Sequence, residues 1–257
     1  MQLFVVILLS SVLALYLWGW RAVHGFFRGV LRPWRAAAFF AGVLTLGAVL
    51  GSPLSTLDHH SLTAHMVQHL LIMTIAAPLI LLGAPVAVLM HLLPAGVSGA
   101  FSRRALFVHP VICWLAGVAV VIAWHVPAIF GAGMKSEGWH TFEQATFLIG
   151  GLLFWRPVIR PWPAMAKWPP WSTPVYLFLA TLPCDALSAF LCLCNRVVYP
   201  HYSPNQLYNL TALKDQACAG ALMWVWVTFA YLLPAAALTF RQLSPERRFA
   251  EKAVVRL

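Results

Sequence analysis

The sequence predicts an all-α integral membrane protein with seven transmembrane helices, an N-terminus outside and a C-terminus in the cytoplasm. Composition, chain length and charge distribution support this prediction. Of the 257 residues, 61% are hydrophobic and 9% are charged, whereas charged residues make up about 25% of a soluble domain. One helix needs about 20 apolar residues to cross a bilayer. Seven helices then use most of the chain, so we expect a single membrane domain over residues 1–257.

Seven apolar segments account for the helices, in chain order. The first, at about 3–20, is followed by basic residues instead of a small-residue cleavage site, so we expect a retained helix and no removable signal peptide. The second apolar run, at about 36–51, is short, so we expect it to extend through Ser52 to Leu57 and to cross as a helix at about 36–57. The third, at about 62–90, is long, and Pro78 and Pro85 should bend or end it. The last four are 107–130, 139–159, 174–195 and 215–240.

Loop charges set the orientation. Fourteen of the 17 Lys and Arg residues fall in alternate loops on one side: Arg21, Arg28, Arg32, Arg35, Arg103, Arg104, Arg156, Arg160, Lys167, Arg241, Arg247, Arg248, Lys252 and Arg256. The other three, Lys135, Arg196 and Lys214, fall on the opposite side. Cytoplasmic loops carry the excess of Lys and Arg, so the basic tail at 241–257 is predicted to be cytoplasmic. The same rule explains the net charge of +10, because the excess of basic residues lies in the cytoplasmic loops. We therefore expect the lipid bilayer as a partner and no nucleic acid.

Seven of the ten histidines map to the outer side in this topology: His59, His60, His65, His69, His125, His140 and His201. Residues four apart share a helix face, so both imidazoles of His65 and His69 can reach one ion. The candidate metal ligands are His65, His69, His125 and His140. Secondary candidates are the nearby carboxylates, thioethers and loop histidine: Glu143, Asp215, Met66, Met223 and His60.

These residue types favour copper as the ion. Imidazole suits copper, zinc and haem iron, and thioether sulfur favours Cu(I), so we expect Cu(I), with haem as an alternative cofactor. Roles without a metal remain open for the same residues. A membrane histidine can donate a hydrogen bond between helices, and the loop histidines can be solvated. The sequence has no glycine-rich phosphate loop, nucleophile elbow or zinc-protease motif. We therefore expect a protein that is not an enzyme.

Several short blocks of the chain, taken in order, resemble the CtaG family of cytochrome c oxidase assembly factors. The blocks are His65-Met66-Val67-Gln68-His69-Leu70-Leu71, Ala77-Pro78-Leu79, Leu82-Gly83-Ala84-Pro85, Trp124-His125-Val126-Pro127, the His140 segment ending in Leu152-Leu153-Phe154-Trp155, Tyr199-Pro200, Asp215-Gln216, Ala219-Gly220 and Met223-Trp224. They cover roughly residues 50 to 230. Gln144 is a departure, because family members often have a histidine after the helix-five glutamate.

The resemblance implies a protein of the bacterial plasma membrane that matures a haem-copper oxidase. Its expected role is to deliver copper to the CuB centre of the oxidase catalytic subunit, receiving the ion directly or from a periplasmic or extracellular copper chaperone. On this reading His65, His69, His125 and His140 are the metal-site positions.

Three other functions remain open from the sequence. A haem-binding redox protein would need histidines at two depths, and only His24, His91 and His109 map inward. A copper transport or resistance protein would need a polar path across the membrane. A metal-free scaffold would bind the oxidase subunits alone.

Overall fold

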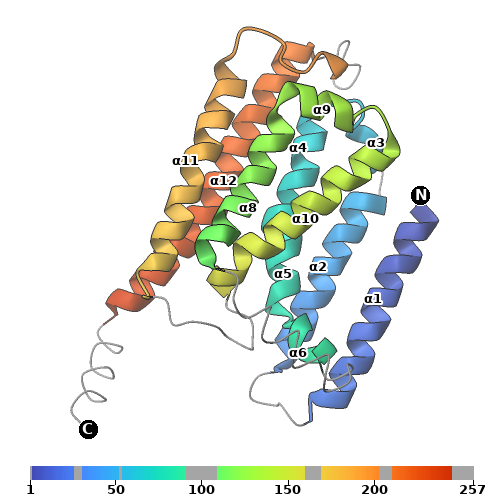
Figure 1. Cartoon of the computed structure of the whole chain (residues 1–257), viewed down its shortest axis with the longest axis vertical. Coiled ribbons are helices and arrows are strands. Elements are labelled where there is room, and N and C mark those ends of the chain that lie inside the picture. The colour runs from blue at the N-terminus through green and yellow to red at the C-terminus, as the bar shows by residue number, and fades with distance from the viewer. Residues whose placement is uncertain are drawn as a thin grey trace.

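The computed structural model describes residues 2–25, 31–51, 54–90, 109–159, 169–202 and 210–244, and every regular element in these ranges is a helix (Figure 1). The helices are α1 (Gln2–Val23), α2 (Pro33–Gly51), α3 (Leu54–Leu57), α4 (Leu62–Leu71), the π-helix η1 (Ile72–Ala76), α5 (Ala77–Leu82), α6 (Pro85–Met90), α8 (Pro110–His125), α9 (Pro127–Gly133), α10 (Glu137–Ile159), α11 (Ser172–Leu193), the 3₁₀ turn η2 (Pro200–Tyr202) and α12 (Ala212–Leu243).

Five helical stretches in the described part of the chain are long and apolar enough to cross a membrane: Leu3–Val23, Pro33–Leu57, Leu62–Leu82, Ser172–Leu193 and Ala212–Leu243. The bent pair α8 and α9 makes a sixth if it is one span. Large apolar side chains cover their outer surfaces; Phe4, Trp18 and Phe240 are each more than 60% exposed. Apolar surface on this scale is buried by lipid. The chain is therefore a multi-pass membrane protein.

The predicted third segment is not one continuous helix. It begins as α4, widens into η1, narrows again in α5, and stops at Ala84, which has a positive φ of 49°, before α6 starts at Pro85. Pro78 has no backbone N–H, so the regular hydrogen-bond ladder cannot run through it. The Trp155 indole donates to the carbonyl of Met73 inside η1, at 2.9 Å, and satisfies an acceptor there. The expected effects of both prolines are thus present, but the π-helix was not predicted.

The predicted fourth segment, 107–130, also differs from the structure. Its helix α8 ends at His125, and α9 restarts at Pro127 after a bend of 82°. Val126 between them is extended, as expected for a residue that precedes proline. Figure 1 shows α9 crossing the end of the bundle near α3 and the start of α10. The bend closes that end of the molecule over the buried polar residues described below.

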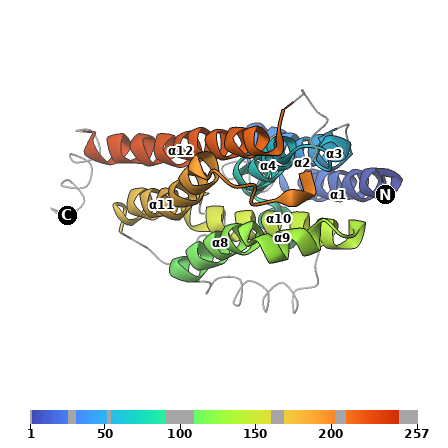
Figure 2. The ribbon, with the colours of Figure 1, turned by 90° about the horizontal axis from the view of Figure 1, so that it is seen from above.

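Two layers of helices enclose the main core. In Figure 2, α8, α9 and α10 form one layer, and α12, α4 and α2 form the other. Helix α10 packs against α8 and α5, and α4 packs against α12. A second, smaller core lies between α1, α2 and α6, where Tyr16 stacks on Phe39 with ring centroids 3.8 Å apart. The main core therefore brings side chains of α4 and α10 together, as the contact between His65 and Glu143 shows.

Two of the glycines allow close contacts between helices of the main core. A Cβ atom at Gly220 of α12 would lie 2.7 Å from the backbone nitrogen of Cys192 and 2.9 Å from the backbone oxygen of Ser188, both in α11. A Cβ atom at Gly151 of α10 would lie 2.9 Å from the Ala77 Cβ. Small residues let membrane helices approach each other this closely. Gly151 thereby sets the approach of α10 to the η1–α5 stretch.

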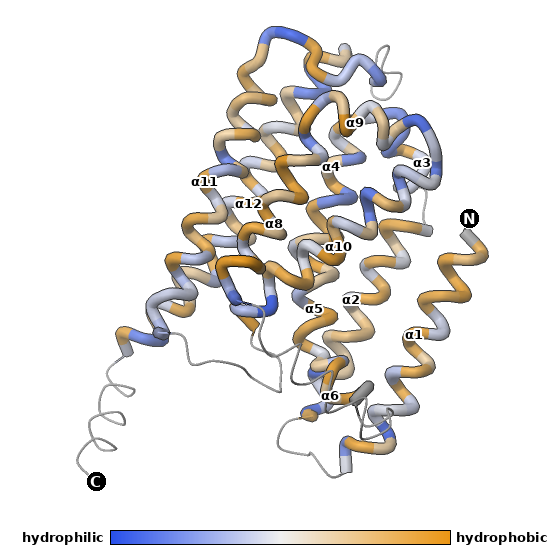
Figure 3. Tube along the Cα trace, viewed as in Figure 1, coloured by the Kyte–Doolittle hydropathy of each residue, from blue (hydrophilic) through white to orange (hydrophobic). Residues whose placement is uncertain are grey.

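Helix bounds otherwise lie within a few residues of the predicted segments. Helix α2 begins at Pro33, α10 begins at Glu137, and α12 extends over Ala212–Leu243. The start of the predicted tail at 241–257 is thus helical, and residues 245–257 lie outside the described part of the chain. Figure 3 shows hydrophilic residues where α3, α9 and the start of α10 meet, in contrast to the apolar middle of the bundle.

Candidate metal centre

The start of α4 is fixed by a carboxylate from α12. Asp215 accepts hydrogen bonds from the Ser61 hydroxyl at 2.9 Å, the Leu62 backbone N–H at 2.7 Å, and the Thr63 backbone N–H and hydroxyl at 3.2 and 2.6 Å. Free N–H groups and the helix dipole make a helix N-terminus a natural partner for a carboxylate. Ser61 also accepts from the Ala64 N–H as the N-cap. This contact anchors the first turn of α4, just before the first candidate ligand.

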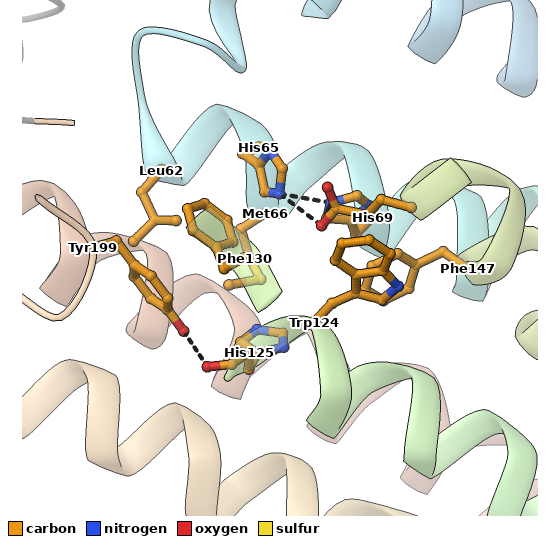
Figure 4. Close-up of a pocket in the computed structure, with 10 residues that line it drawn as sticks. Leu62, His65, Met66, His69, Trp124, His125, Phe130, Phe147 and Tyr199 are labelled. Carbon is orange, nitrogen blue, oxygen red and sulfur yellow. Dashed lines mark hydrogen bonds and ion pairs between the residues drawn. The ribbon is translucent and has the colours of Figure 1, made fainter. Parts of the chain in front are cut away.

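Three side chains from α4 and α10 meet at one point, and we call them the inner cluster: His65, His69 and Glu143. The Nε2 atoms of the two histidines are 2.7 Å apart, and the Glu143 Oε1 atom lies 3.3 Å from His65 Nε2 and 3.2 Å from His69 Nε2. All three residues are buried. Figure 4 shows His65 and His69 turned toward the same point between the helices. The predicted pair on one helix face thus meets a carboxylate from the facing layer.

The inner cluster fits a metal ion. Metal bonds of about 2.0–2.2 Å to imidazole nitrogen and carboxylate oxygen place tetrahedral ligands about 3.3 Å apart. The two distances to Glu143 match this spacing, and the two histidines would need to separate by roughly half an ångström. The other polar atoms, Nδ1 of His65 and of His69 and Oε2 of Glu143, have no hydrogen-bond partner among the described residues. A buried carboxylate is costly without compensation, and an ion would supply it.

Aromatic packing orients the two imidazoles. The His69 ring stacks on Phe147 with centroids 4.1 Å apart, and the His65 ring meets the edge of Phe130 at 5.2 Å. Metal-bound histidines more often use a hydrogen bond from the second ring nitrogen for this purpose. In this cluster, packing takes that role and leaves both rings aimed at Glu143.

A small pocket lies beside the inner cluster and has room for little more than one water-sized particle. It is lined by Leu62, His65, Met66, His69, Trp124, His125, Phe130, Glu143, Phe147 and Tyr199 (Figure 4). The Nδ1 atom of His125 lies 2.7 Å from the Val121 carbonyl oxygen, so it is the protonated nitrogen. The lone pair of His125 is then on Nε2. His125 borders the pocket, but it does not join the inner cluster.

His140 belongs to a second group, which we call the outer cluster: Asp58, His59 and His140. The Nε2 atom of His140 is 3.5 Å from Asp58 Oδ2, and that of His59 is 3.7 Å from Asp58 Oδ1. Burial raises the pKa of the Asp58 carboxyl above its usual value, and the nearby His59 and His65 act in the opposite direction. The structure therefore divides the four predicted histidine ligands among an inner pair, a pocket wall and a neighbouring cluster.

The secondary candidates have separate places. Glu143 is in the inner cluster, and Met66 lines the pocket. Met223 is buried in the main core, His60 is exposed, and the Asp215 carboxylate is occupied by the α4 cap.

Gln144 is not one of the residues of either cluster, but its side-chain nitrogen lies 3.5 Å from Nε2 of His140 in the outer cluster. Its side chain donates to Gln68 Oε1 at 3.1 Å. Gln68 in turn donates to the Val49 carbonyl oxygen of α2 at 3.3 Å. The residue that departs from the family pattern thus links α10 to α4, and through it to α2.

Sequence reasoning missed Asp58 as a candidate ligand. It precedes a histidine pair directly after an apolar segment, and that position is the only local signal. It is completely buried, and the Tyr202 hydroxyl, 144 residues away in the chain, donates to its backbone oxygen at 2.9 Å. A contact of this range leaves no periodic pattern in the sequence.

The fold and these clusters define a class: a multi-pass helical membrane protein with buried histidine and carboxylate groups near one end of its bundle. The chain belongs to the Caa3_CtaG family, the cytochrome c oxidase caa3 assembly factors, whose family model matches residues 14–244. The resemblance found in the sequence is thereby confirmed.

Two curated relatives are similar over most of this chain. They are an uncharacterized protein of Mycobacterium bovis and one of Mycobacterium tuberculosis, each 23% identical over 234 residues. The match covers 85% of this chain and 35% of each relative, so the chain spans about a third of the length of the curated relatives it matches. No solved structure matches the chain.

Proposed function

We propose that this assembly factor holds a copper ion at the inner cluster and passes it to the CuB centre of a haem-copper oxidase. The observation that carries the proposal is the convergence of His65, His69 and Glu143, buried and at ligand spacing, in a member of an oxidase assembly family. Copper is the cargo here. The partners are the oxidase catalytic subunit and, upstream, a copper chaperone outside the membrane or free copper.

We propose a seven-span topology in the bacterial plasma membrane, with the N-terminus and both clusters on the outer side. Helix α10 is the seventh span: its 23 residues reach about 34 Å at 1.5 Å per residue. Its polar residues lower its hydropathy, but His140 and Glu143 face the bundle interior. Arg21, Arg156 and Arg241 end their helices at the opposite end of the bundle from the clusters (Figure 1). That end is the cytoplasmic one by the positive-inside rule.

The donor set favours copper over haem. Two imidazoles and a carboxylate suit a divalent first-row ion, and among these Cu²⁺ binds most strongly. The Met66 thioether lines the same pocket and is the type of donor that Cu(I) prefers. Haem needs a cavity of several hundred cubic ångströms, whereas this pocket holds about one water-sized particle. A copper ion is the cargo that the described residues fit, in either oxidation state.

Transfer of copper to the oxidase needs a site that both binds and releases the ion. Three protein ligands leave a coordination position open, and a histidine of the oxidase can enter there before the ligands of this protein leave. Each step then exchanges one imidazole for another, so the ion is never free in the bilayer. Burial of the inner cluster protects the ion from exchange with water until the oxidase docks.

The test is oxidase maturation in cells that produce only the His69→Ala variant. The control is His24→Ala, which removes an exposed histidine at the other end of the bundle. We expect the oxidase from His69→Ala cells to assemble with haem but to contain at most about a tenth of the normal CuB, measured as copper per haem. The control should be normal. Full CuB content in both strains, with His69→Ala present in the membrane at wild-type level, would overturn the proposal.

A further inference from the structure

We propose that the outer cluster of Asp58, His59 and His140 is a second metal-ion site, which takes a divalent first-row ion and connects outside water to the inner cluster. It deepens the proposed function by adding a loading route, and it rests on that function for the identity of the cargo. The three ligand atoms lie within 4.8 Å of one another, as those of the inner cluster do.

The strongest sign of a ligand is the Asp58 carboxylate. Asp58 is completely buried, and neither carboxylate oxygen has a hydrogen-bond partner among the described residues. The two histidine nitrogens lie 3.5 and 3.7 Å from the carboxylate oxygens, beyond good hydrogen-bond length, and the Gln68 side chain and the His59 backbone N–H also lie near enough to lower the pKa of the carboxyl. A buried carboxylate is stable only when it is paired or coordinates a metal. Its spacing from the histidines is close to that of two ligands on one ion, about 3.3 Å.

The fold holds Asp58 in place through its backbone. The Tyr202 hydroxyl donates to the Asp58 carbonyl oxygen, and the N–H groups of His60 and Ser61 both donate to the carbonyl of Leu57. These bonds to backbone carbonyls hold the turn between α3 and α4, and neither carboxylate oxygen of Asp58 makes a hydrogen bond of good geometry among the described residues.

The exposure and spacing of the histidines define a path from outside water to the inner cluster. The His59 side chain is 42% exposed, whereas those of His140 and Asp58 are buried. The His140 ring lies 5.1 Å from the His59 ring and 5.6 Å from the His65 ring, centroid to centroid. His140 is thus between the exposed histidine and the inner cluster. An ion captured at His59 can reach His65 by exchanging one ligand at a time.

The test is copper stoichiometry of the full chain, purified in detergent and dialysed against excess Cu²⁺. We expect two ions per chain in the wild type and one in His59→Ala. His60→Ala is the matched control, because it removes an exposed neighbouring histidine outside the cluster, and it should retain two. Asp58→Asn, which keeps the side-chain shape, should also retain one. A chelator should remove one of the two wild-type ions quickly and the other slowly. His59→Ala should release its single ion slowly, because the fast phase belongs to the outer cluster.

The outcomes separate the second site from the inner one. Two ions in His59→Ala, or a single wild-type ion that is lost in His69→Ala but kept in His59→Ala, would overturn the second site and leave the proposed function standing. A single wild-type ion that is lost in His59→Ala and kept in His69→Ala would support the outer cluster and overturn the inner one. No bound ion in the wild type would overturn both.

Discussion

The carboxylate that caps α4 is the point where a single substitution should test how the site is built. Asp215→Ala removes the acceptor for two backbone N–H groups and two hydroxyls at the start of α4. His65 lies within the next turn, so the same change should loosen the first ligand of the inner cluster. We therefore expect both stability and copper affinity to fall.

The magnitude follows from the hydrogen bonds. One bond to a charged acceptor contributes about 1.5–3 kcal/mol, and the contributions of grouped bonds do not add fully. Ser61 still caps the Ala64 N–H after the change, which preserves part of the helix start. We expect a loss of about 3–5 kcal/mol of unfolding free energy, in the range found when one partner of a buried charged contact is removed. Asp215→Asn keeps one acceptor oxygen and should lose about 1–2 kcal/mol.

The assay is reversible unfolding in mixed detergent micelles, followed by helical circular dichroism. Glu137→Ala is the control, because Glu137 is an exposed acidic residue in the first turn of α10; its loss should change the free energy by about 0.5 kcal/mol or less. A loss below about 1 kcal/mol for Asp215→Ala, equal to the control, would refute the capping role derived from the contacts.

Three further substitutions test the packing and the site. Trp155→Phe leaves the Met73 carbonyl without its donor and should lower the unfolding free energy by about 1 kcal/mol in the same assay; no change would mean that the indole bond does not support the π-helix. Gly220→Ala should lower it by about 1–3 kcal/mol through overpacking, while Gly131→Ala, with open space around its Cβ position, should not; equal effects would contradict the close helix contact. Glu143→Gln keeps the side-chain shape but loses the charge, and competition with a copper chelator should show affinity reduced at least about 10–100-fold; wild-type affinity would remove Glu143 from the ligand set.

The sequence was most informative about composition and periodicity. Long apolar runs predicted the helices of the described part of the chain to within a few residues, because each span must be apolar on its lipid-facing side. Breaks inside the runs were harder to locate. The sequence contains Pro127 and Pro85 at the two breaks. The 82° bend before Pro127 and the restart of the helix at Pro85, after Ala84, depend on tertiary packing. The π-helix precedes Pro78, a visible signal for a break, but the indole of Trp155 that donates to its Met73 carbonyl comes from a distant helix.

The candidate site was predictable in part for a similar reason. The spacing of His65 and His69 is local to one helix, so their shared face could be inferred from the sequence. Glu143 was a secondary candidate from the sequence, but its direct contact with this pair could not be inferred, because it lies 78 residues from His65 and reaches it through the packing of α10 on α5. Asp215 illustrates the converse: a buried carboxylate suggests a functional site, and here its contacts assign it to a helix cap.

The most direct test of the account is copper binding by the purified full chain, with the His65→Ala, His69→Ala double variant compared with His24→Ala. Equilibrium dialysis with Cu(I) under reducing conditions and with Cu²⁺ in air, followed by metal analysis, gives copper per chain for each oxidation state. We expect the double variant to lose the tightly held, slowly released ion while the control keeps it. Equal copper content and release rates in the two variants would contradict the assignment of the inner cluster as the copper site.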